Sequence, residues 1–341
     1  MLKHRTDEYH NGNRINYNAT SALLTQLKKE EKTDWLQDVS SVPLQQTLRH
    51  LQTAFTNFFS KRTGYPTFKK RSGKQSAEFT RAGFKWDAKN NVLTMAKMGS
   101  LRIKWSREFS ADPTTVTISK DSSDRYFVSF RIDEPNKIFP ETNNKVGLDL
   151  GITHLATLST GEKIGNPKNT KKYEKRLKLL QKKLSRRTKG SKRRNKARKQ
   201  VAKLHTKIAD SRLDYLHKTS TKLIQENQLI AIEDLSVRNM MQNRKLSKAI
   251  GDCGWSEFVR QLEYKAEWYN RDVVKIDRFF PSSKRCSQCG FISKSMPLNI
   301  RKWLCPDCKT EHDRDINAAI NILAVGQTVL AQGQSVRPKR T

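Results

Sequence analysis

Residues 146–151 read VGLDLG and place a single carboxylate, Asp149, inside a short apolar segment. The valine and leucines around it are typical of a buried β-strand. Burying a carboxylate without a partner is costly, so Asp149 requires a cation, a backbone amide or another polar group. The chain has 67 Lys and Arg residues against 33 Asp and Glu residues, a formal net charge of +34. A lone buried acid in so basic a chain indicates a candidate functional residue.

Two further acids occur in matching contexts. Glu233 lies near the end of the apolar segment LIAIEDL (229–235), and Asp315 lies near the start of the helical pattern DRDINAAINIL (313–323). Three carboxylates that met in one place would repel one another unless cations joined them, and Mg²⁺ prefers carboxylate oxygen. Two such ions about 4 Å apart activate a water and stabilise the leaving oxygen of a phosphodiester. We therefore predict that Asp149, Glu233 and Asp315 form a catalytic site with two Mg²⁺ ions.

Each acid also has an ordinary structural interpretation. Asp149 can accept hydrogen bonds from backbone amides of the following turn, and Glu233 can pair with one of many lysines. Asp315 can cap its helix, which is the commonest use of Asp at such a place. The nearest rivals for the site are Asp234 and Asp313. Strand alternation favours Glu233 over Asp234, because it puts Glu233 on the same face as the apolar residues two positions away.

Four of the five cysteines form two Cys-x2-Cys pairs separated by 15 residues. The pairs are Cys286–Cys289 and Cys305–Cys308. This spacing is typical of a structural zinc site in which four thiolates complete a tetrahedron. Metal ligands of this kind indicate a reducing cytoplasm rather than a disulfide scaffold. We expect His312 to be a bystander, because four sulfurs fill the site, and Cys253 to be a small buried residue.

The charge surplus indicates a polyanionic partner, with nucleic acid ahead of an anionic membrane. The segment 168–203 is about half Lys or Arg, and we expect it to lie in two long helices within 168–227 that break near Gly190. A solvated surface or a phosphate-binding face explains such a segment, and the near absence of acids favours phosphate. Tyr65 and Phe68, beside further cations, are either base-stacking residues or core. The predicted nucleic-acid-binding residues are Lys69, Lys70, Arg71, Lys182, Arg186, Arg187, Arg193 and Arg194.

Several motifs together resemble the transposon-encoded TnpB proteins, which are compact RNA-guided nucleases related to type V CRISPR effectors. The motifs are GLDLG, IAIEDL, RFFPSSKRCSQCG, WLCPDC and HDRDINAAINI, and the match runs from about Tyr65 to about Leu323. The resemblance implies a guide RNA that pairs with one strand of double-stranded target DNA, in the prokaryotic cytoplasm at the nucleoid. It also implies that Asp149, Glu233 and Asp315 are the catalytic acids of three RuvC motifs.

The same resemblance implies an α/β chain with a RuvC-like RNase H fold and an inserted four-cysteine zinc ribbon, preceded by a β-barrel region that carries a helical insert. Helical patterning over 15–60 and short alternating segments over 79–132 agree with this order. No apolar run approaches about 18 residues, so no membrane-spanning helix is predicted. The expected domains are a helical recognition-type insert (1–62), a wedge-like β-barrel (63–140), the first part of the RuvC-like nuclease domain (141–283), the zinc ribbon (284–310), the last RuvC-like helix (311–325) and a flexible tail (326–341).

The chain departs from the family pattern at its start. Family members usually begin with a strand and a helix that end in a segment like WNxML, whereas this sequence starts at Met1-Leu2. We therefore expect an N-terminal truncation that removes one strand of the RNA-gripping barrel. A misassigned start codon, a truncated gene copy and a genuinely shorter variant would each explain it. The intact acids favour an RNA-guided, Mg²⁺-dependent DNA endonuclease, and the truncation favours a non-cleaving DNA- or RNA-binding factor that modulates transposition. A ribosome-associated zinc protein would explain the charge and the cysteines but not the three acids.

Overall fold

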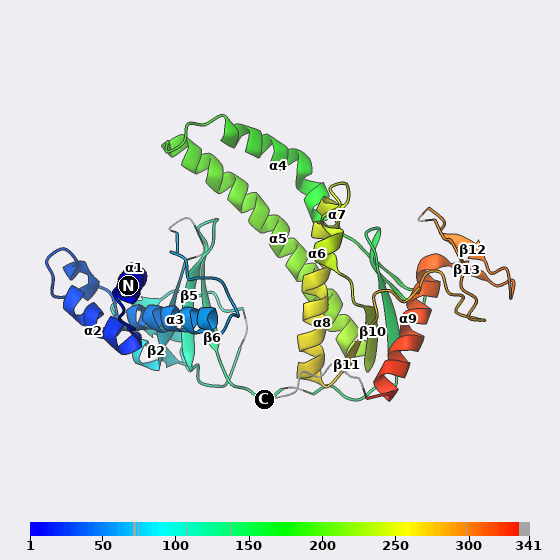
Figure 1. Cartoon of the computed structure of the whole chain (residues 1–341), viewed down its shortest axis with the longest axis horizontal. Coiled ribbons are helices and arrows are strands. Elements are labelled where there is room, and N and C mark those ends of the chain that lie inside the picture. The colour runs from blue at the N-terminus through cyan, green and yellow to red at the C-terminus, as the bar shows by residue number, and fades with distance from the viewer. Residues whose placement is uncertain (71–72, 74, 107, 137, 298, 334–341) are drawn as a thin grey trace. The chain divides into compact units, whose positions relative to one another are not determined.

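The computed structural model describes residues 1–70, 73, 75–106, 108–136, 138–297 and 299–333. The chain divides into two compact units, Met1–Pro135 and Asn136–Thr341, each with a core of its own (Figure 1). Both units contain helices and strands, which confirms the expected mixed α/β class. Within the described residues, no helix has the length and apolar composition that crossing a bilayer requires.

The first unit combines helices with two three-stranded antiparallel sheets. Its helices are α1 (Leu2–His10), α2 (Tyr17–Leu27), η1 (Asp34–Gln37), α3 (Ser41–Phe59) and η2 (Arg81–Gly83). The sheets are β1-β5-β6 (Gln75–Thr80, Thr115–Lys120, Tyr126–Arg131) and β2-β3-β4 (Phe84–Asp87, Val92–Met95, Gly99–Leu101). Phe79, Leu93 and Val116 form a core shared by both sheets. Helix α3, which buries Leu48 and Phe55, packs against β1.

The second unit is built on a five-stranded mixed sheet with the order β11-β10-β7-β8-β9. Its strands are β7 (Lys145–Leu150), β8 (His154–Leu158), β9 (Lys163–Gly165), β10 (Leu229–Glu233) and β11 (Asp272–Ile276). β10 runs parallel to β7 and β11, whereas β8 is antiparallel to β7 and β9. In this register Ala231 lies opposite Gly147, and Glu233 lies opposite Ile276. The carboxyl ends of β7 and β10, which carry Asp149 and Glu233, therefore meet at the same end of the sheet.

Helices cover both faces of this sheet, and side-chain alternation decides which residues face them. The helices are α4 (Asn169–Ser185), α5 (Lys192–Glu226), α6 (Val237–Met240), α7 (Ser247–Cys253), α8 (Trp255–Tyr269) and α9 (Arg314–Ala331). Val146 and Leu148 of β7 join α5 and α8 in the main core. Because successive strand residues point to opposite faces, Gly147 and Asp149 turn toward α9 instead. Helix α9 continues to Ala331, beyond residue 325, where we expected it to end.

Two glycines allow α9 to lie directly on the sheet. A Cβ atom added to Gly147 would come within 2.1 Å of the Ala319 carbonyl oxygen, and one added to Gly326 would come within 2.4 Å of the Ala231 Cβ. Asp149 lies two residues beyond Gly147, about 7 Å along the strand, and Asp315 lies four residues before Ala319, about 6 Å along the helix. The close contact at Gly147 therefore sets how near the two acids come.

We predict that Gly147→Ala destabilises the second unit by about 1–3 kcal/mol or more, because the new methyl group meets backbone that cannot move aside. Thermal or urea unfolding of the purified chain measures the change. Gly165→Ala at the end of β9 is the matched control, since its added Cβ meets no atom within 4 Å. Equal stability of the Gly147→Ala variant and the control would contradict the prediction.

Candidate functional site

Asp149 lies near the end of β7, on the face of the sheet that α9 covers. Within the described part of the chain, its carboxyl group has no hydrogen-bond or ion-pair partner, so the turn that follows supplies no amide to it. Burial, and then the charges of Glu233 and Asp315, raise the pKa of Asp149 to about 8, while the more weakly acting Arg314 and Arg301 oppose the shift. The environment of Asp149 therefore disfavours its negative charge unless a cation is added.

Glu233 is the last residue of β10, and its carboxylate accepts a hydrogen bond from the Ser282 hydroxyl group. Burial raises the pKa of Glu233, and the hydrogen bond from Ser282 offsets part of that shift. The next residue, Asp234, is half-exposed and forms an ion pair with Arg278. The two adjacent acids thus have different environments: Glu233 interacts with Asp149, and Asp234 is neutralised at the surface.

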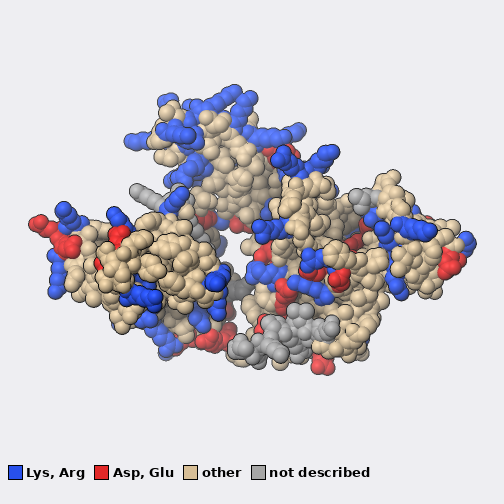
Figure 2. Space-filling view, in the orientation of Figure 1, with Lys and Arg blue, Asp and Glu red and all other residues tan. Residues whose placement is uncertain are grey.

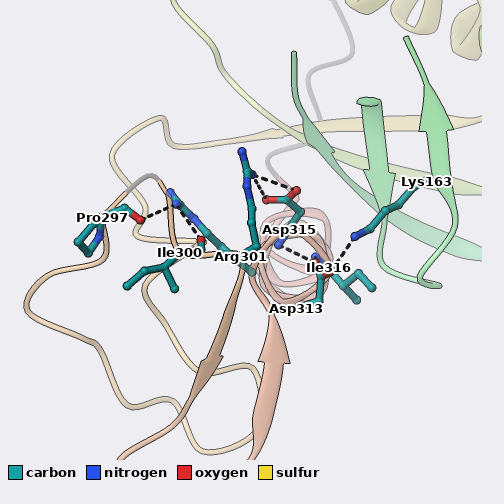
Figure 3. Close-up of polar contacts among 8 residues, drawn as sticks. Lys163, Pro297, Ile300, Arg301, Asp313, Asp315 and Ile316 are labelled. Carbon is teal, nitrogen blue, oxygen red and sulfur yellow. Dashed lines mark hydrogen bonds and ion pairs between the residues drawn. The ribbon is translucent and has the colours of Figure 1, made fainter. Parts of the chain in front are cut away.

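The start of α9 is capped by Asp313, not by Asp315 (Figure 3). The Asp313 carboxylate accepts hydrogen bonds from the backbone amides of Asp315 and Ile316 and, at 2.7 Å, from the Lys163 ammonium group. Burial opposes ionisation, yet these hydrogen bonds lower the pKa of Asp313. The interpretation of Asp315 as the helix cap is therefore wrong, and its side chain is left for another role.

Arg301, which precedes strand β12 (Lys302–Leu304), lies over Asp315 (Figure 3). Its Nη1 atom is 3.3 Å from the Asp315 Oδ1 atom. The backbone amide of Arg314 donates a hydrogen bond to the Arg301 carbonyl group at 2.8 Å, and the Arg314 guanidinium group donates one to the Pro297 carbonyl group at 3.1 Å. These contacts join the start of α9 to the cysteine-rich segment and bring positive charge beside the acids.

The structure brings Asp149, Glu233 and Asp315 close enough for the charges of the other two to act on Asp149. Among the described residues, the four cysteines have their ligand atoms within 4.8 Å of one another. The carboxylate oxygens of the three acids do not lie that close together. A site for two divalent ions about 3.5–4 Å apart needs acids spread more widely than the ligands of one ion. The Asp149 carboxyl group, which the described residues leave without a partner, and the oxygen-only donor set fit Mg²⁺ ions of this kind.

The four cysteines of the predicted metal site converge. Cys286, Cys289, Cys305 and Cys308 place their sulfur atoms within 4.8 Å of one another. The Cys286–Cys308 and Cys289–Cys305 sulfur atoms are each 3.6 Å apart. A tetrahedral zinc ion with bonds of about 2.3 Å requires sulfur separations of about 3.8 Å, so the cluster fits zinc without rearrangement. The fifth cysteine, Cys253, is buried elsewhere, as we expected.

The two cysteine pairs lie in equivalent turns. In each, the amide of the first cysteine donates to a carbonyl group five residues later, at 2.8 or 2.9 Å, and the amide four residues later donates back at 3.0 Å. His312, in strand β13 (Glu311–Asp313), is buried, and its Nε2 atom is 3.0 Å from the Cys286 sulfur. Burial lowers the pKa of His312, so a neutral imidazole can donate a hydrogen bond to this sulfur. We had expected a bystander, but His312 contacts one of the four ligands.

The predicted basic helices are α4 and α5, and the break between them contains Gly190 with φ of +87°. Figure 2 shows Lys and Arg side chains gathered over the outer part of this hairpin. Lys182, Arg186 and Arg193 are exposed. The Arg194 guanidinium group instead donates to the carbonyl groups of Leu184 and Arg187 at 3.0 and 2.9 Å, which holds the turn of the hairpin together.

The weaker predicted patch belongs to the first unit. Lys69 and Lys70 are exposed, and Arg71 lies outside the described residues. Tyr65 packs edge-on against the aromatic rings of α3, with its ring centroid 5.7 Å from that of Phe55. Phe68 is 70% exposed. Of the two aromatic residues, Phe68 is therefore the more exposed, since Tyr65 is 46% exposed and also packs on α3.

Several residues of the site have no role assigned from the sequence: Ser282 on Glu233, Arg301 on Asp315, and Lys163 on Asp313. Ser282 lies in the quoted motif RFFPSSK, and only this motif signalled it. No sequence motif distinguishes Lys163 and Arg301 from the many other cations of the chain. Their pairing with Asp313 and Asp315 depends on how the strands meet α9.

Comparison with known protein families matches the chain in two segments. A model described as "Probable transposase" (OrfB_IS605) matches residues 128–244, and a model described as "Cas12f1-like, TNB domain" matches residues 255–322. The first includes Asp149 and Glu233, and the second includes the four cysteines and Asp315. The matched segments therefore contain every candidate metal ligand.

Two relatives cover most of the chain. A "Putative RNA-guided DNA endonuclease" of Streptomyces pristinaespiralis is 51% identical over 331 residues, which are 96% of this chain and 82% of that protein. A protein of Escherichia coli (strain K12) with the same description, InsQ, is 34% identical over 99% of this chain and 88% of its own. A chain in the "Cryo-EM structure of the Cas12f1-sgRNA-target DNA complex" has a TM-score of 0.59 over 94% of this chain and 78% of its own. At 13% identity, that similarity shows a shared fold.

We predict that Cys305→Ser loses about one bound zinc ion per chain and lowers the melting temperature, because three thiolates no longer complete the tetrahedron. Metal analysis of the purified protein and a thermal melt measure both effects. The control is Cys253→Ala, which removes the buried cysteine outside the cluster and should keep its zinc. Equal zinc contents in the two variants would contradict a four-cysteine site.

We also predict that Asp149→Asn makes the protein more stable at about pH 8 when zinc is retained and no Mg²⁺ or Mn²⁺ is added. The folded-state pKa of about 8 is above the unfolded value of about 3.9, so the folded state binds the proton more tightly. The resulting stabilisation is complete below about pH 4 and is lost as the pH rises to about 8.

Melting temperatures of both proteins from about pH 5 to about pH 8 test this prediction. The wild type should lose stability relative to the Asn variant across this range. Saturating Mn²⁺ should stabilise the wild type more than the variant, because only the wild type offers this carboxylate to the ion. A variant that is no more stable than the wild type at pH 8 without added metal would contradict the assigned environment of Asp149.

Proposed function

Because the chain belongs to the TnpB family, we propose that it is an RNA-guided DNA endonuclease, associated with a transposon, that hydrolyses phosphodiester bonds with divalent metal ions. The observation that carries the proposal is the Asp149 carboxyl group, which is largely withdrawn from solvent, has no hydrogen-bond or ion-pair partner among the described residues, and lies beside Glu233 and Asp315 at one end of the sheet. In this proposal the chain acts in the prokaryotic cytoplasm at the nucleoid. Its partners are a guide RNA and double-stranded target DNA.

The topology of the second unit supports a RuvC-like RNase H fold. A mixed sheet with one antiparallel strand, β8, carries acids at the ends of two parallel strands, and a helix after the cysteine segment supplies the third. The two small sheets around one core in the first unit support the proposed wedge-like barrel, with the helices of residues 1–62 as its helical insert. The change of unit at Pro135 lies close to the boundary at residue 140 that the sequence predicts.

We assign Asp149, Glu233 and Asp315 as the catalytic acids. Two bound Mg²⁺ ions would supply Lewis-acid stabilisation of the scissile phosphate and a nucleophilic water. The protein residues orient these ions: β7 and β10 fix two acids by strand register, and α9 adds the third from above the sheet. Arg301, already paired with Asp315, can share its charge with an incoming phosphate.

We assign zinc to the four cysteines as a structural ion. Four sulfurs leave no open position for a substrate, so the site cannot act as a Lewis acid. Strand β13, which follows the last cysteine, ends at Asp313, and α9 begins at the next residue. In this proposal the zinc-bound segment serves to hold the start of α9 and Asp315 in place.

Nucleic acid binding is assigned to the α4–α5 hairpin and to the cations near Lys69. The exposed Lys182, Arg186 and Arg193 lie on a hairpin where Glu174 is already paired with Lys178 and Lys248. The hairpin therefore has a surplus of positive charge that phosphate groups would neutralise, with release of counterions. The basic segments have the role of gripping the backbone of RNA or DNA, and the base pairs of the guide supply sequence selection.

The test is cleavage of a matched DNA duplex by the RNA-loaded protein with Mg²⁺. Asp149→Ala should lower the cleavage rate by orders of magnitude while the affinities for RNA and DNA stay within about twofold, because the acid acts on the ions and not on the nucleic acid backbone. Gel-based cleavage and a filter-binding or anisotropy assay measure the two quantities.

Asp234→Ala is the matched control, because it removes a half-exposed acid that directly follows Glu233 and pairs with Arg278. It should cut at nearly the wild-type rate. Binding of RNA and matching DNA by the wild type without any cutting would overturn the nuclease assignment and favour the non-cleaving nucleic-acid-binding factor. Unchanged cutting by Asp149→Ala would overturn the assignment of the acids.

A further inference from the structure

The turn from Ser282 to Ser287 is held by two buried asparagines of α9. The Asn321 Nδ2 atom donates hydrogen bonds to the carbonyl groups of Ser282 and Arg285 at 2.9 and 2.7 Å. Asn317 donates to the same two carbonyl groups at 3.5 and 2.7 Å, and its Oδ1 atom accepts from the Ser287 amide at 2.9 Å. Two side chains on one helix face therefore satisfy several backbone groups of a single turn. An arrangement of this kind fixes the turn relative to α9.

Ser282 itself is 4% exposed, and its hydroxyl group donates to the Oε1 atom of Glu233. Its amide donates to the Phe280 carbonyl group at 2.8 Å. The Phe280 ring packs on Ala231, Ile276 and Ile322, which belong to β10, β11 and α9. The segment that carries Ser282 is thus held by the apolar contacts of Phe280 and by the hydrogen bonds from the two asparagines. The hydroxyl group therefore has little freedom to move.

We propose that Ser282 is a positioning residue that orients the Glu233 carboxylate for metal binding beside Asp149 and Asp315. Asn317 and Asn321 hold Ser282 in place through its carbonyl group. The inference rests on the proposed function for the role of Glu233. A glutamate side chain has three rotatable bonds, and burial alone does not choose among its orientations. A hydrogen bond to one carboxylate oxygen fixes the plane of the group and leaves the other oxygen free for an ion.

The hydrogen bonds from Asn317 and Asn321 to the Ser282 turn also connect two of the acids to the same helix, α9. Asp315 is part of α9, and Glu233 is linked to α9 through Ser282 and the two asparagines. The position of α9 therefore bears on the orientation of the Glu233 carboxylate as well as on the position of Asp315. This explains why a hydroxyl group and two amides are buried here instead of apolar side chains, which would fill the space at lower desolvation cost.

The first experiment compares Ser282→Ala, Ser282→Thr and Ser283→Ala in the full chain with guide RNA bound. Mn²⁺ affinity is measured by titration calorimetry, and single-turnover cleavage is measured as a function of Mg²⁺ concentration. Ser282→Ala should weaken Mn²⁺ binding and raise the Mg²⁺ concentration for half-maximal cleavage by about 10- to 100-fold, as expected for a residue that orients a metal ligand. DNA affinity should not change.

Ser282→Thr retains the hydroxyl group and should stay within about threefold of the wild type. Ser283→Ala, in the adjacent residue of the same turn, should behave as the wild type. The proposal is overturned if Ser282→Ala binds Mn²⁺ and responds to Mg²⁺ as the wild type does, or if Ser282→Thr is as impaired as Ser282→Ala. Melting temperatures show whether a variant remains folded.

A second experiment tests the hydrogen bonds from Asn321 to the Ser282 turn. Asn321→Asp keeps the shape of the side chain and removes the donor that holds the Ser282 and Arg285 carbonyl groups. It should weaken Mn²⁺ binding in the same direction, and the double variant with Ser282→Ala should be no weaker than Ser282→Ala alone, because both act through one hydroxyl group. Additive effects would overturn the role of the asparagine. If Asn321→Asp does not fold, the Ser282 variants decide the proposal.

A wild-type complex that binds Mn²⁺ but does not cut DNA would refute the proposed function, and the Mn²⁺ affinities of the variants would still decide the role of Ser282. A wild-type complex that cuts, together with a fully active Ser282→Ala variant of unchanged metal affinity, would refute the positioning role alone.

Discussion

At Gly147, helix α9 lies against the sheet with no side chain of that residue between them, and most of the candidate site depends on that contact. Gly147 on β7 and Gly326 on the helix leave the two backbones at a distance that no larger residue permits. The same helix carries Asp315, the capping contacts of Asp313 and the asparagines that hold the turn of Ser282. One packing interaction therefore places Asp315 directly and holds the turn whose Ser282 hydroxyl group contacts the Glu233 carboxylate.

In the absence of metal ions, the negative charges of the three acids are unfavourable for the folded state. Burial and two neighbouring acids disfavour the charge on Asp149, while Arg301 is already paired with Asp315. Such a cluster opposes folding, and divalent ions would turn the repulsion into attraction. The basic hairpin has the opposite imbalance, since its cations repel one another until phosphate groups are bound. Binding of the nucleic acid and binding of the ions would each relieve a different excess of charge.

The sequence predicted the parts of this unit that depend on local pattern. The strands of VGLDLG and LIAIEDL, the break at Gly190 and the convergence of the four cysteines are each determined by a few adjacent residues or by ligand spacing. It did not predict the cap by Asp313, the pairing of Arg301 or the hydrogen bond from Ser282 to Glu233. These contacts join segments far apart in the chain and depend on the register of β12 with β13 and on the placement of α9, which no local pattern encodes.

The order of the elements along the chain has a consequence for synthesis on the ribosome. Helix α9 follows β7, β10 and the basic hairpin in the chain, so the third acid is translated after the other two and after the hairpin. A nascent or prematurely terminated product that lacks residue 315 would carry the cationic surface but not the complete set of acids. Under the proposed function, such a product would hold nucleic acid without the complete set of acids that cutting requires.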